Sequence, residues 1–245
     1  MTVTSLISLA LLAGSGAALK LQRGLSDDGM DLGQLFAQWQ GQKPGSKVVV
    51  DIGAGYHPLK PDDTTFVVMV EPQQKAVEFL NKKYGHDSRV CIIHAAISDH
   101  NGTQNLTHYI LEGRMSSLDT PNGWGKGSSD AEVVNVTTLD TILRAIPLEK
   151  FGGAIELMQI DAQGEDYHIV KSAGDLLKKV KEIKAEVYKD GFLTYFTNNS
   201  KGHDWAPLMK NKGFVEEGCE KGLTKNTYGY HTAELRCTYR NKLFK

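Results

Sequence analysis

The stretch Val48-Val49-Val50-Asp51-Ile52-Gly53-Ala54-Gly55 decides the fold of this 245-residue chain. A short run of β-branched residues predicts a strand buried on both faces, which is typical of a parallel sheet covered by helices. The glycines that follow can adopt positive φ and let a ligand approach the backbone closely. Because ligands bind at the carboxyl edge of open α/β sheets, this stretch predicts a binding site as well as a strand.

Downstream of this stretch, apolar runs alternate with helical patterns. Further strands are predicted at Phe66–Val70, Val90–Ile97, Val133–Val136, Leu157–Ile160 and Ile183–Val187. Helices are predicted at Gln74–Tyr84, Thr138–Ile146 and Tyr167–Val180, with a short amphipathic helix within Asp28–Trp39. The stretch Tyr228–Tyr239 alternates polar and apolar residues, which predicts an antiparallel edge strand. The expected fold is therefore α/β, with a Rossmann-like, mainly parallel sheet and a C-terminal antiparallel strand.

Composition describes an ordinary globular protein, with 40% hydrophobic and 23% charged residues. A formal net charge of -1 provides no overall field that would attract nucleic acid, so none is expected as a partner. The three cysteines, Cys91, Cys219 and Cys237, include no C-x-x-C pair, so no metal site is expected. Cys219 and Cys237 would pair across a hairpin in an oxidising compartment, but two unpaired thiols are the favoured prediction.

The first 19 residues carry no charged side chain and resemble a signal peptide, with an apolar run followed by small residues. Removal of residues 1–18 would place the protein in the secretory pathway or outside the cell. The alternatives are an uncleaved membrane anchor, which would be the chain's only membrane contact, or an apolar helix packed on a cytoplasmic domain. N-glycosylation sequons start at Asn101, Asn105, Asn135 and Asn198. Residues 20–46 are predicted to form an N-terminal helix and linker, and residues 47–245 the main domain.

The second predicted strand ends in Glu71-Pro72, twenty residues after Asp51. An acid at this position is placed to accept hydrogen bonds from the hydroxyls of an adenosine ribose. The dinucleotide fingerprint G-x-G-x-x-G would need a third glycine at position 58, where this chain has Pro58. A nucleotide-dependent oxidoreductase is therefore disfavoured. A phosphate-free adenosine ligand such as S-adenosylmethionine fits better.

A third carboxylate, Asp161, follows the strand predicted at Leu157–Ile160, and here the sequence resembles the FkbM-type family of S-adenosylmethionine-dependent methyltransferases. The resemblance rests on motifs that occur in the family's order: Asp51-Ile52-Gly53-Ala54, Glu71-Pro72, Ala96-Ile97-Ser98-Asp99, Ser116-Ser117-Leu118, Thr138-Leu139-Asp140 and Ile160-Asp161-Ala162-Gln163-Gly164-Glu165-Asp166. It implies a class I methyltransferase fold and methyl transfer to a nucleophile, usually a hydroxyl oxygen of a small molecule or glycan.

The resemblance also implies roles for individual residues. The methionine end of the cofactor would be lined by Asp51, Gly53, Ala54 and Gly55, and its ribose would be held by Glu71. Its adenine would be flanked by Ala96 and Ile97. Asp161 would lie near the cofactor amine or the transferring methyl, where it is the leading candidate for a catalytic base, with His57 next.

The sequence departs from the family between Gly55 and Phe66, where the chain is too short and too rich in proline for the usual first crossover helix. This departure leaves open a second hypothesis, a cofactor-binding module of the same fold without turnover. The glycine-rich stretch from Thr120 to Ser129 is a candidate lid over the acceptor or else a surface loop.

Overall fold

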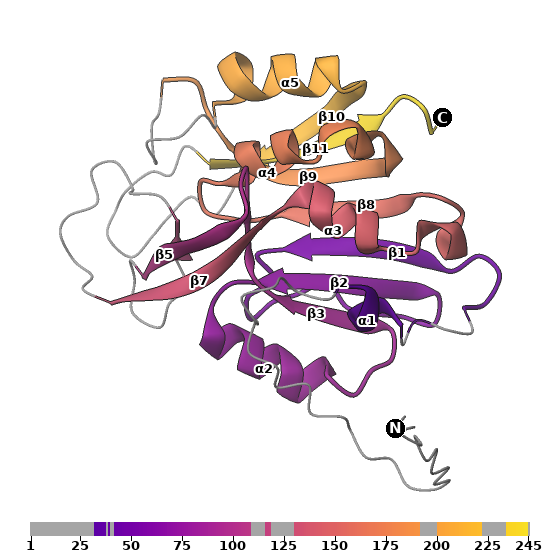
Figure 1. Cartoon of the computed structure of the whole chain (residues 1–245). Helices are drawn as coiled ribbons and strands as arrows, with labels where there is room; N and C mark the ends of the chain where they lie inside the picture. The colour runs from indigo at the N-terminus through magenta and orange to yellow at the C-terminus, as the bar shows by residue number, and fades with distance from the viewer. Residues whose placement is uncertain are drawn as a thin grey trace, which may run out of the picture.

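A computed structural model of the protein describes residues 32–37, 39, 42–108, 116–118, 130–191, 200–221 and 234–244. Its centre is a seven-stranded sheet with the order β10-β11-β9-β8-β1-β2-β3 (Figure 1). The strands of this main sheet are β1 (Lys47–Ile52), β2 (Thr65–Glu71), β3 (Val90–His94), β8 (Ile155–Ile160), β9 (Val180–Tyr188), β10 (Phe214–Lys221) and β11 (Glu234–Asn241).

The main sheet is parallel except at one strand. β1 pairs in parallel with β2 and β8, and the parallel order continues to β3 on one side and β9 on the other. β11 runs antiparallel to both of its neighbours, β9 and β10. The predicted α/β class, the mainly parallel sheet and the antiparallel C-terminal strand are thus confirmed.

The prediction that the C-terminal strand lies at the edge of the sheet is wrong. β11 lies between β9 and β10, and its side chains Leu235, Cys237 and Tyr239 are buried in the main core. The edge is formed by β10, whose residues are mostly exposed. The sequence of β10, which is polar and contains Gly218, concealed this strand because an edge strand needs little apolar surface.

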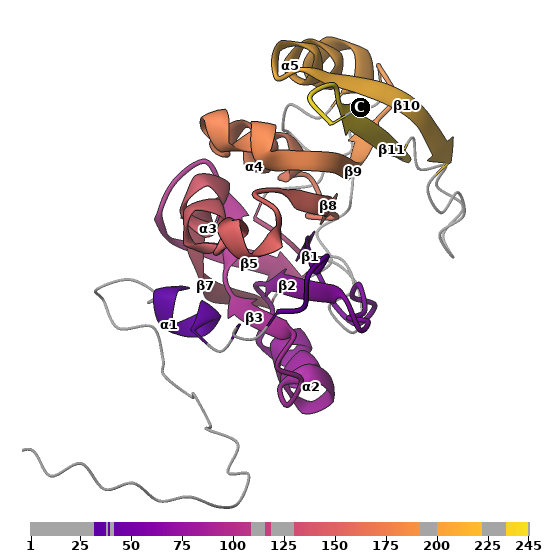
Figure 2. The same cartoon turned by 90° about the vertical axis from the view of Figure 1, so that its right-hand side faces the viewer.

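Helices cover both faces of the main sheet. They are α1 (Leu32–Phe36), α2 (Gln74–Tyr84), α3 (Leu139–Ala145), α4 (Asp166–Ser172) and α5 (Ala206–Asn211), with short helical turns at Leu148–Phe151, Gly174–Lys179 and Lys201–Trp205. α1, α3 and α4 lie on one side of the sheet (Figure 2) and contribute to the larger core. Leu80 of α2 packs on the opposite face in a smaller core with Val67 and Met69.

A second, four-stranded sheet has the order β4-β7-β5-β6 and projects beyond the main sheet (Figure 1). Its strands are β4 (Ala96–Ser98), β5 (Gly102–His108), β6 (Ser116–Ser117) and β7 (Ala131–Thr138). The single strand predicted at Val90–Ile97 is therefore divided at Ala95 between the two sheets. An apolar run does not reveal such a division, because both halves are buried.

The predicted helix at Tyr167–Val180 is also divided. α4 ends at Ser172, a short 3-10 helix covers Gly174–Lys179, and Val180 already belongs to β9. Gly174 has a φ of +55°, which α-helical geometry does not allow. By contrast, α2 has the predicted bounds, and Thr138 caps α3 by accepting a hydrogen bond from the Thr141 amide.

The predicted N-terminal helix is described from Leu32 onward, and it packs against the main domain as expected. Leu32, Phe36 and Trp39 are buried, and Trp39 contacts the rings of Phe66 and Phe151 edge to face. Residues 1–31, which include the predicted leader, lie outside the described residues. Among the helices that the structure describes, none has the length and apolar character needed to cross a membrane.

Candidate active site

The carboxyl ends of three neighbouring strands bring the predicted site residues together. Ile52 at the end of β1 pairs with Val70 of β2 on one side and with Ile160 of β8 on the other. Gly53, Glu71 and Asp161 therefore begin the turns at one edge of the sheet. The sequence placed each of them after a strand, and the parallel register makes them neighbours.

At Gly53 the backbone of the turn after β1 lies very close to the backbone of Asp161, which follows β8. It has a φ of +77°, and a Cβ at this position would overlap the carbonyl oxygen of Asp161. The Asp161 amide also donates a hydrogen bond to the Ile52 carbonyl at 3.0 Å. Only glycine permits this conformation and this approach together, so the glycine predicted from the motif has a specific steric reason.

Asp51 shapes the turn that follows β1. Its side chain accepts a hydrogen bond from the Leu59 amide at 2.7 Å and one from the Gln159 side chain at 3.3 Å. Burial raises the pKa of Asp51 to about 6, and the charge of Asp161 adds to the increase, although both hydrogen bonds oppose it. The segment between β1 and β2 contains no helix, as predicted. Its backbone is instead fixed at Leu59 by the hydrogen bond to the Asp51 side chain.

Glu71 ends β2 and is almost fully buried. One carboxylate oxygen accepts a hydrogen bond from the Gly55 amide at 2.8 Å, and the other accepts one from the Gln73 amide at 2.9 Å. Burial raises the pKa of Glu71 to about 7, against these two bonds, and the charge of Asp51 raises it further. Each oxygen retains a lone pair for another donor.

Asp161 lies at the centre of a polar network beyond β8. The Gln163 side chain donates to one Asp161 carboxylate oxygen at 2.9 Å, and Arg236 donates to the other at 3.2 Å. The same two side chains also approach the Glu186 carboxylate. Gln163 donates a hydrogen bond to it at 3.2 Å, and Arg236 lies 3.6 Å from it. Two carboxylates from adjacent strands thus share two donors, and this arrangement fixes the orientation of Asp161.

Glu186, Arg236 and Glu234 also belong to this network, and the sequence motifs did not predict them. Glu186 follows the rule for the carboxyl ends of parallel strands, so its place near the end of the run Ile183–Val187 was a usable signal. Arg236 and Glu234 come from the antiparallel strand β11, whose register opposes Arg236 to Glu186. Only the pairing of β11 with β9 shows that they belong to the site.

Burial alters the protonation of the inner carboxyl groups. Burial raises the pKa of Asp166 to about 8, and the charge of Asp161 raises it further. The pKa of Glu186 is raised well above its ordinary value by burial and then by the charge of Asp161, and burial also raises the pKa of Glu234. Clusters of carboxyl groups with raised pKa values are typical of sites that handle protons.

The family motifs on the second sheet fix the loop that carries Asp161. The buried Ser98 hydroxyl donates to Glu165 at 2.8 Å, and the Ser117 hydroxyl donates to the Gln163 carbonyl at 2.7 Å. Gln163 has a φ of +51°, an unfavourable conformation for a residue with a Cβ. These bonds hold a strained loop in place, as is common where side chains must be positioned for function.

The remaining predicted residues occupy defined positions, but their roles stay predictions. His57 lies in the turn after Gly55, and its side chain is exposed. Ala54, Ala96 and Ile97 are buried. Ala54 lies in the turn after β1, and the other two lie in β4. Of the other histidines near this edge, His94 contacts the Pro72 carbonyl at 2.9 Å. The candidate lid at 120–129 lies outside the described residues.

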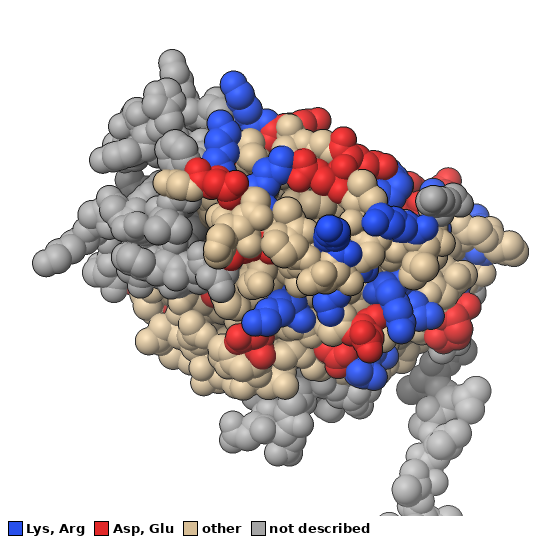
Figure 3. Space-filling view, turned by 90° about the horizontal axis from the view of Figure 1, so that it is seen from above, with Lys and Arg blue, Asp and Glu red and all other residues tan. Residues whose placement is uncertain are grey.

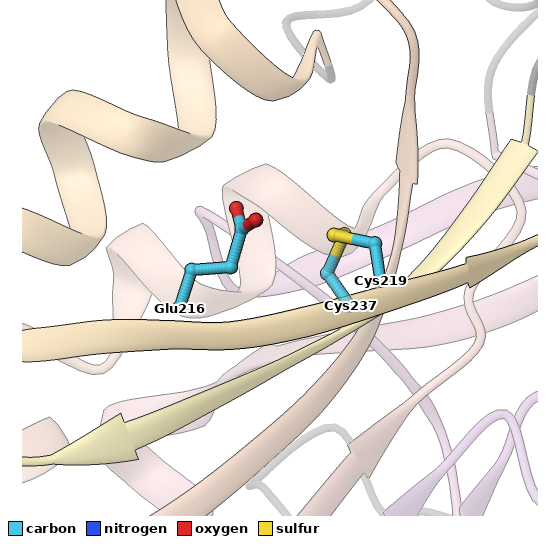
Figure 4. A group of neighbouring side chains, drawn as sticks. All are labelled: Glu216, Cys219 and Cys237. Carbon is cyan, nitrogen blue, oxygen red and sulfur yellow. A yellow bond between two sulfur atoms is a disulfide. The ribbon is translucent and has the colours of Figure 1, made fainter.

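Cys219 and Cys237 form a disulfide, so the prediction of two unpaired thiols is wrong. They lie directly opposite each other on β10 and β11, which is the hairpin pairing that the sequence offered as the less favoured alternative. Glu216 lies on the same side of the sheet (Figure 4), and these three are the one group in the described residues whose ligand atoms are close enough for a metal. Because the sulfurs are bonded to each other, they are not thiolate ligands in this form.

This topology defines a class. The sheet has seven strands, of which only β11, next to the edge strand β10, is antiparallel, and acidic residues lie at the carboxyl ends of β1 and β2. This is the Rossmann-like arrangement of class I methyltransferases. The family model described as the methyltransferase FkbM domain matches residues 53–216. The chain therefore belongs to the FkbM methyltransferase family, and it is an S-adenosylmethionine-dependent methyltransferase. The family match excludes the disfavoured oxidoreductase hypothesis.

The solved structures to which the chain is similar share little sequence with it. Magnesium protoporphyrin IX methyltransferase from Synechocystis PCC 6803, with bound S-adenosylmethionine, is 11% identical, with 86% of this chain and 76% of that chain covered and a TM-score of 0.42. A TehB-like methyltransferase from Corynebacterium glutamicum is 8% identical, with 86% and 87% covered and a TM-score of 0.41. An rRNA methylase from Streptococcus thermophilus is 8% identical, with 85% and 93% covered and a TM-score of 0.40. No curated protein matches the sequence.

The residues at the sheet edge suit this cofactor. Glu71 presents two carboxylate oxygens of the kind that accept hydrogen bonds from ribose hydroxyls. Gly55, with a φ of +49° and no close contact where a Cβ would lie, leaves the turn after β1 accessible for a ligand to approach the backbone. Asp51 and Asp161 add negative charge, which favours a cation.

Proposed function

We propose that the protein methylates a hydroxyl oxygen of a small molecule or glycan. One observation carries this proposal: the carboxylate of Asp161 follows β8, next to the strand that carries Asp51 and two strands from the one that carries Glu71, and 27% of its side chain is exposed. A hydroxyl must lose its proton as it is methylated, and a fixed carboxylate next to the donor can accept that proton.

S-adenosylmethionine, when bound, supplies a methyl group that is already activated by its sulfonium. The protein's contribution is then mainly to orient the acceptor and remove its proton. Gln163 and Arg236 hold both Asp161 oxygens, so the carboxylate is oriented before the acceptor arrives. Partial exposure allows the proton to pass from Asp161 to solvent after transfer. We retain His57 as an alternative base because it lies in the turn at the same edge.

The acceptor experiment combines a cofactor with a deuterated methyl group and extracts of small molecules and glycans. Mass spectrometry is expected to find the label on a hydroxyl oxygen. The variant Asp161→Asn preserves shape and should bind the cofactor while losing most transfer. Label found only on nitrogen, sulfur or carbon would refute the proposed chemistry. Cofactor binding without transfer to any acceptor would favour the binding-module hypothesis.

We further infer that nucleic acid is not the acceptor. In the view onto α5 and the C-terminal strands, basic and acidic side chains are intermixed, and the described residues of this one face form no broad basic patch (Figure 3). The formal net charge of -1 is consistent with this view. Phosphate backbones are bound chiefly by clustered Lys and Arg. Incubation of total RNA with labelled cofactor should therefore leave the RNA unlabelled, and labelled RNA would overturn this inference.

We propose that the protein passes through an oxidising compartment of the secretory pathway. Two observations support this proposal, namely the apolar residues 1–18 and the disulfide between Cys219 and Cys237, since disulfides persist mainly in such compartments. N-terminal sequencing of the expressed full chain is expected to begin near Leu19. A chain recovered from the cytosol that still begins at Met1, with free thiols, would contradict the proposal.

A further inference from the structure

Three of the four sequons lie on one exposed face of the second sheet. β5 and β7 place Thr103 opposite Asn135 and Asn105 opposite Val133. Because alternate residues of a strand share a face, these four side chains point to the same side. Val133 is 72% exposed on this side, whereas Leu106, Val134 and Val136 are buried on the other. The face away from the core therefore concentrates glycosylation sequons beside an uncovered apolar residue.

Asn101 is the one asparagine of these three sequons that lies in a turn. It is exposed in the turn between β4 and β5, outside any strand. Its side-chain oxygen accepts a hydrogen bond from the Thr137 hydroxyl at 3.1 Å, which leaves the amide nitrogen directed away from that bond. A Cβ on the next residue, Gly102, would have open space around it. The atom that N-glycosylation modifies is thus presented in an uncrowded turn.

We propose that Asn101 carries an N-linked glycan. The amide nitrogen of Asn101 forms a bond to the anomeric carbon of a lipid-linked oligosaccharide, the donor of the secretory pathway. The bond from that carbon to the phosphate oxygen breaks, polyprenyl diphosphate leaves, and the amide loses one proton. The proposal rests on passage through the secretory pathway and not on the identity of the methyl acceptor.

The other two sequons on this face are less favourable acceptors in the structure. Asn135 is half-buried in β7, the strand that lies between β4 and β5. Asn105 is exposed, but it lies within β5, where it pairs with Val133 of β7. A glycan on Asn101 would extend over the same face and cover Val133. Such cover would explain why an apolar side chain is exposed at this position.

The test expresses the full chain in cultured cells that glycosylate secreted proteins. Peptide-N-glycosidase digestion in heavy-oxygen water converts a glycosylated asparagine to labelled aspartate, which peptide mass spectrometry locates. The label is expected at Asn101. Thr103→Ala destroys the sequon and should reduce this label to the background that spontaneous deamidation of Asn101-Gly102 gives without the glycosidase, whereas Thr103→Ser preserves the sequon and should retain the full label.

The outcomes separate the glycan from the proposals on which it depends. Secreted protein that lacks residues 1–18 but has an unmodified Asn101, or a label only at Asn105 or Asn135, would overturn the glycan proposal alone. Protein retained in the cytosol with its leader intact would overturn both the glycan and the secretory route. Neither result changes the interpretation of methyl transfer, which is measured separately.

Discussion

Cofactor affinity should fall as the pH is lowered from 8 to 6, because the two buried anchors lose their charge. Burial raises the pKa of Glu71 to about 7 and that of Asp51 to about 6. A raised carboxyl pKa means that the neutral form persists to higher pH, so acidification protonates both groups within this range. The ionised forms bind ribose hydroxyls and a cation more strongly than the neutral forms.

The size of the effect follows from the fraction of molecules in which both carboxyls are ionised. That fraction is about 0.9 at pH 8 and about 0.05 at pH 6, so the dissociation constant should rise about 20-fold. At pH 7, binding should release about 0.6 of a proton, most of it from Glu71. In Glu71→Gln only Asp51 titrates, so the rise should shrink to about twofold.

Isothermal titration calorimetry of S-adenosylmethionine at pH 6, 7 and 8 measures the affinity. Repetition in buffers of different ionisation enthalpy counts the released protons. The Glu71→Gln variant separates the Glu71 carboxyl from the ionisation of the cofactor's own amine, which is common to both proteins. A wild-type dissociation constant that changes by less than about twofold between pH 8 and 6, with no proton release, would refute the assignment of Glu71 as a charged anchor.

Three further predictions concern the fold and the site. Gly53→Ala should destabilise the protein by more than Gly45→Ala. Positive φ costs either variant about 1–2 kcal/mol, but only at position 53 would the new Cβ also overlap the Asp161 carbonyl. Equal midpoints of urea unfolding for the two variants would contradict this prediction. Replacement of Cys219 and Cys237 by Ser should lower the free energy of unfolding by about 2–4 kcal/mol, as measured by denaturant titration against the oxidised wild type. Trp39→Ala should cost about 3–5 kcal/mol because the ring is fully buried between Phe36, Phe66 and Phe151, and a thermal melt unchanged from wild type would show that the N-terminal segment is not part of the core.

The sequence by itself determined the class of sheet and the inner part of the site. β-branched runs marked the parallel strands, and the residues after them had to meet at one edge because parallel strands end there. Asp51, Gly53, Glu71 and Asp161 could be assigned for this reason. The absence of the first crossover helix could likewise be predicted, because prolines and a short connection exclude it.

Only the tertiary structure decided the C-terminal part of the molecule and the outer part of the site. β10 is polar because it is an edge, so no periodic pattern identified it, and without this strand the pairing of Cys219 with Cys237 stayed the less favoured of two alternatives. The antiparallel pairing of β11 with β9 sets Arg236 beside Glu186, and it also brings Arg236 to Asp161, which lies 75 residues earlier in the sequence. Local patterns report which face of an element is buried, whereas such long-range pairs depend on strand order and register, which no local pattern contains.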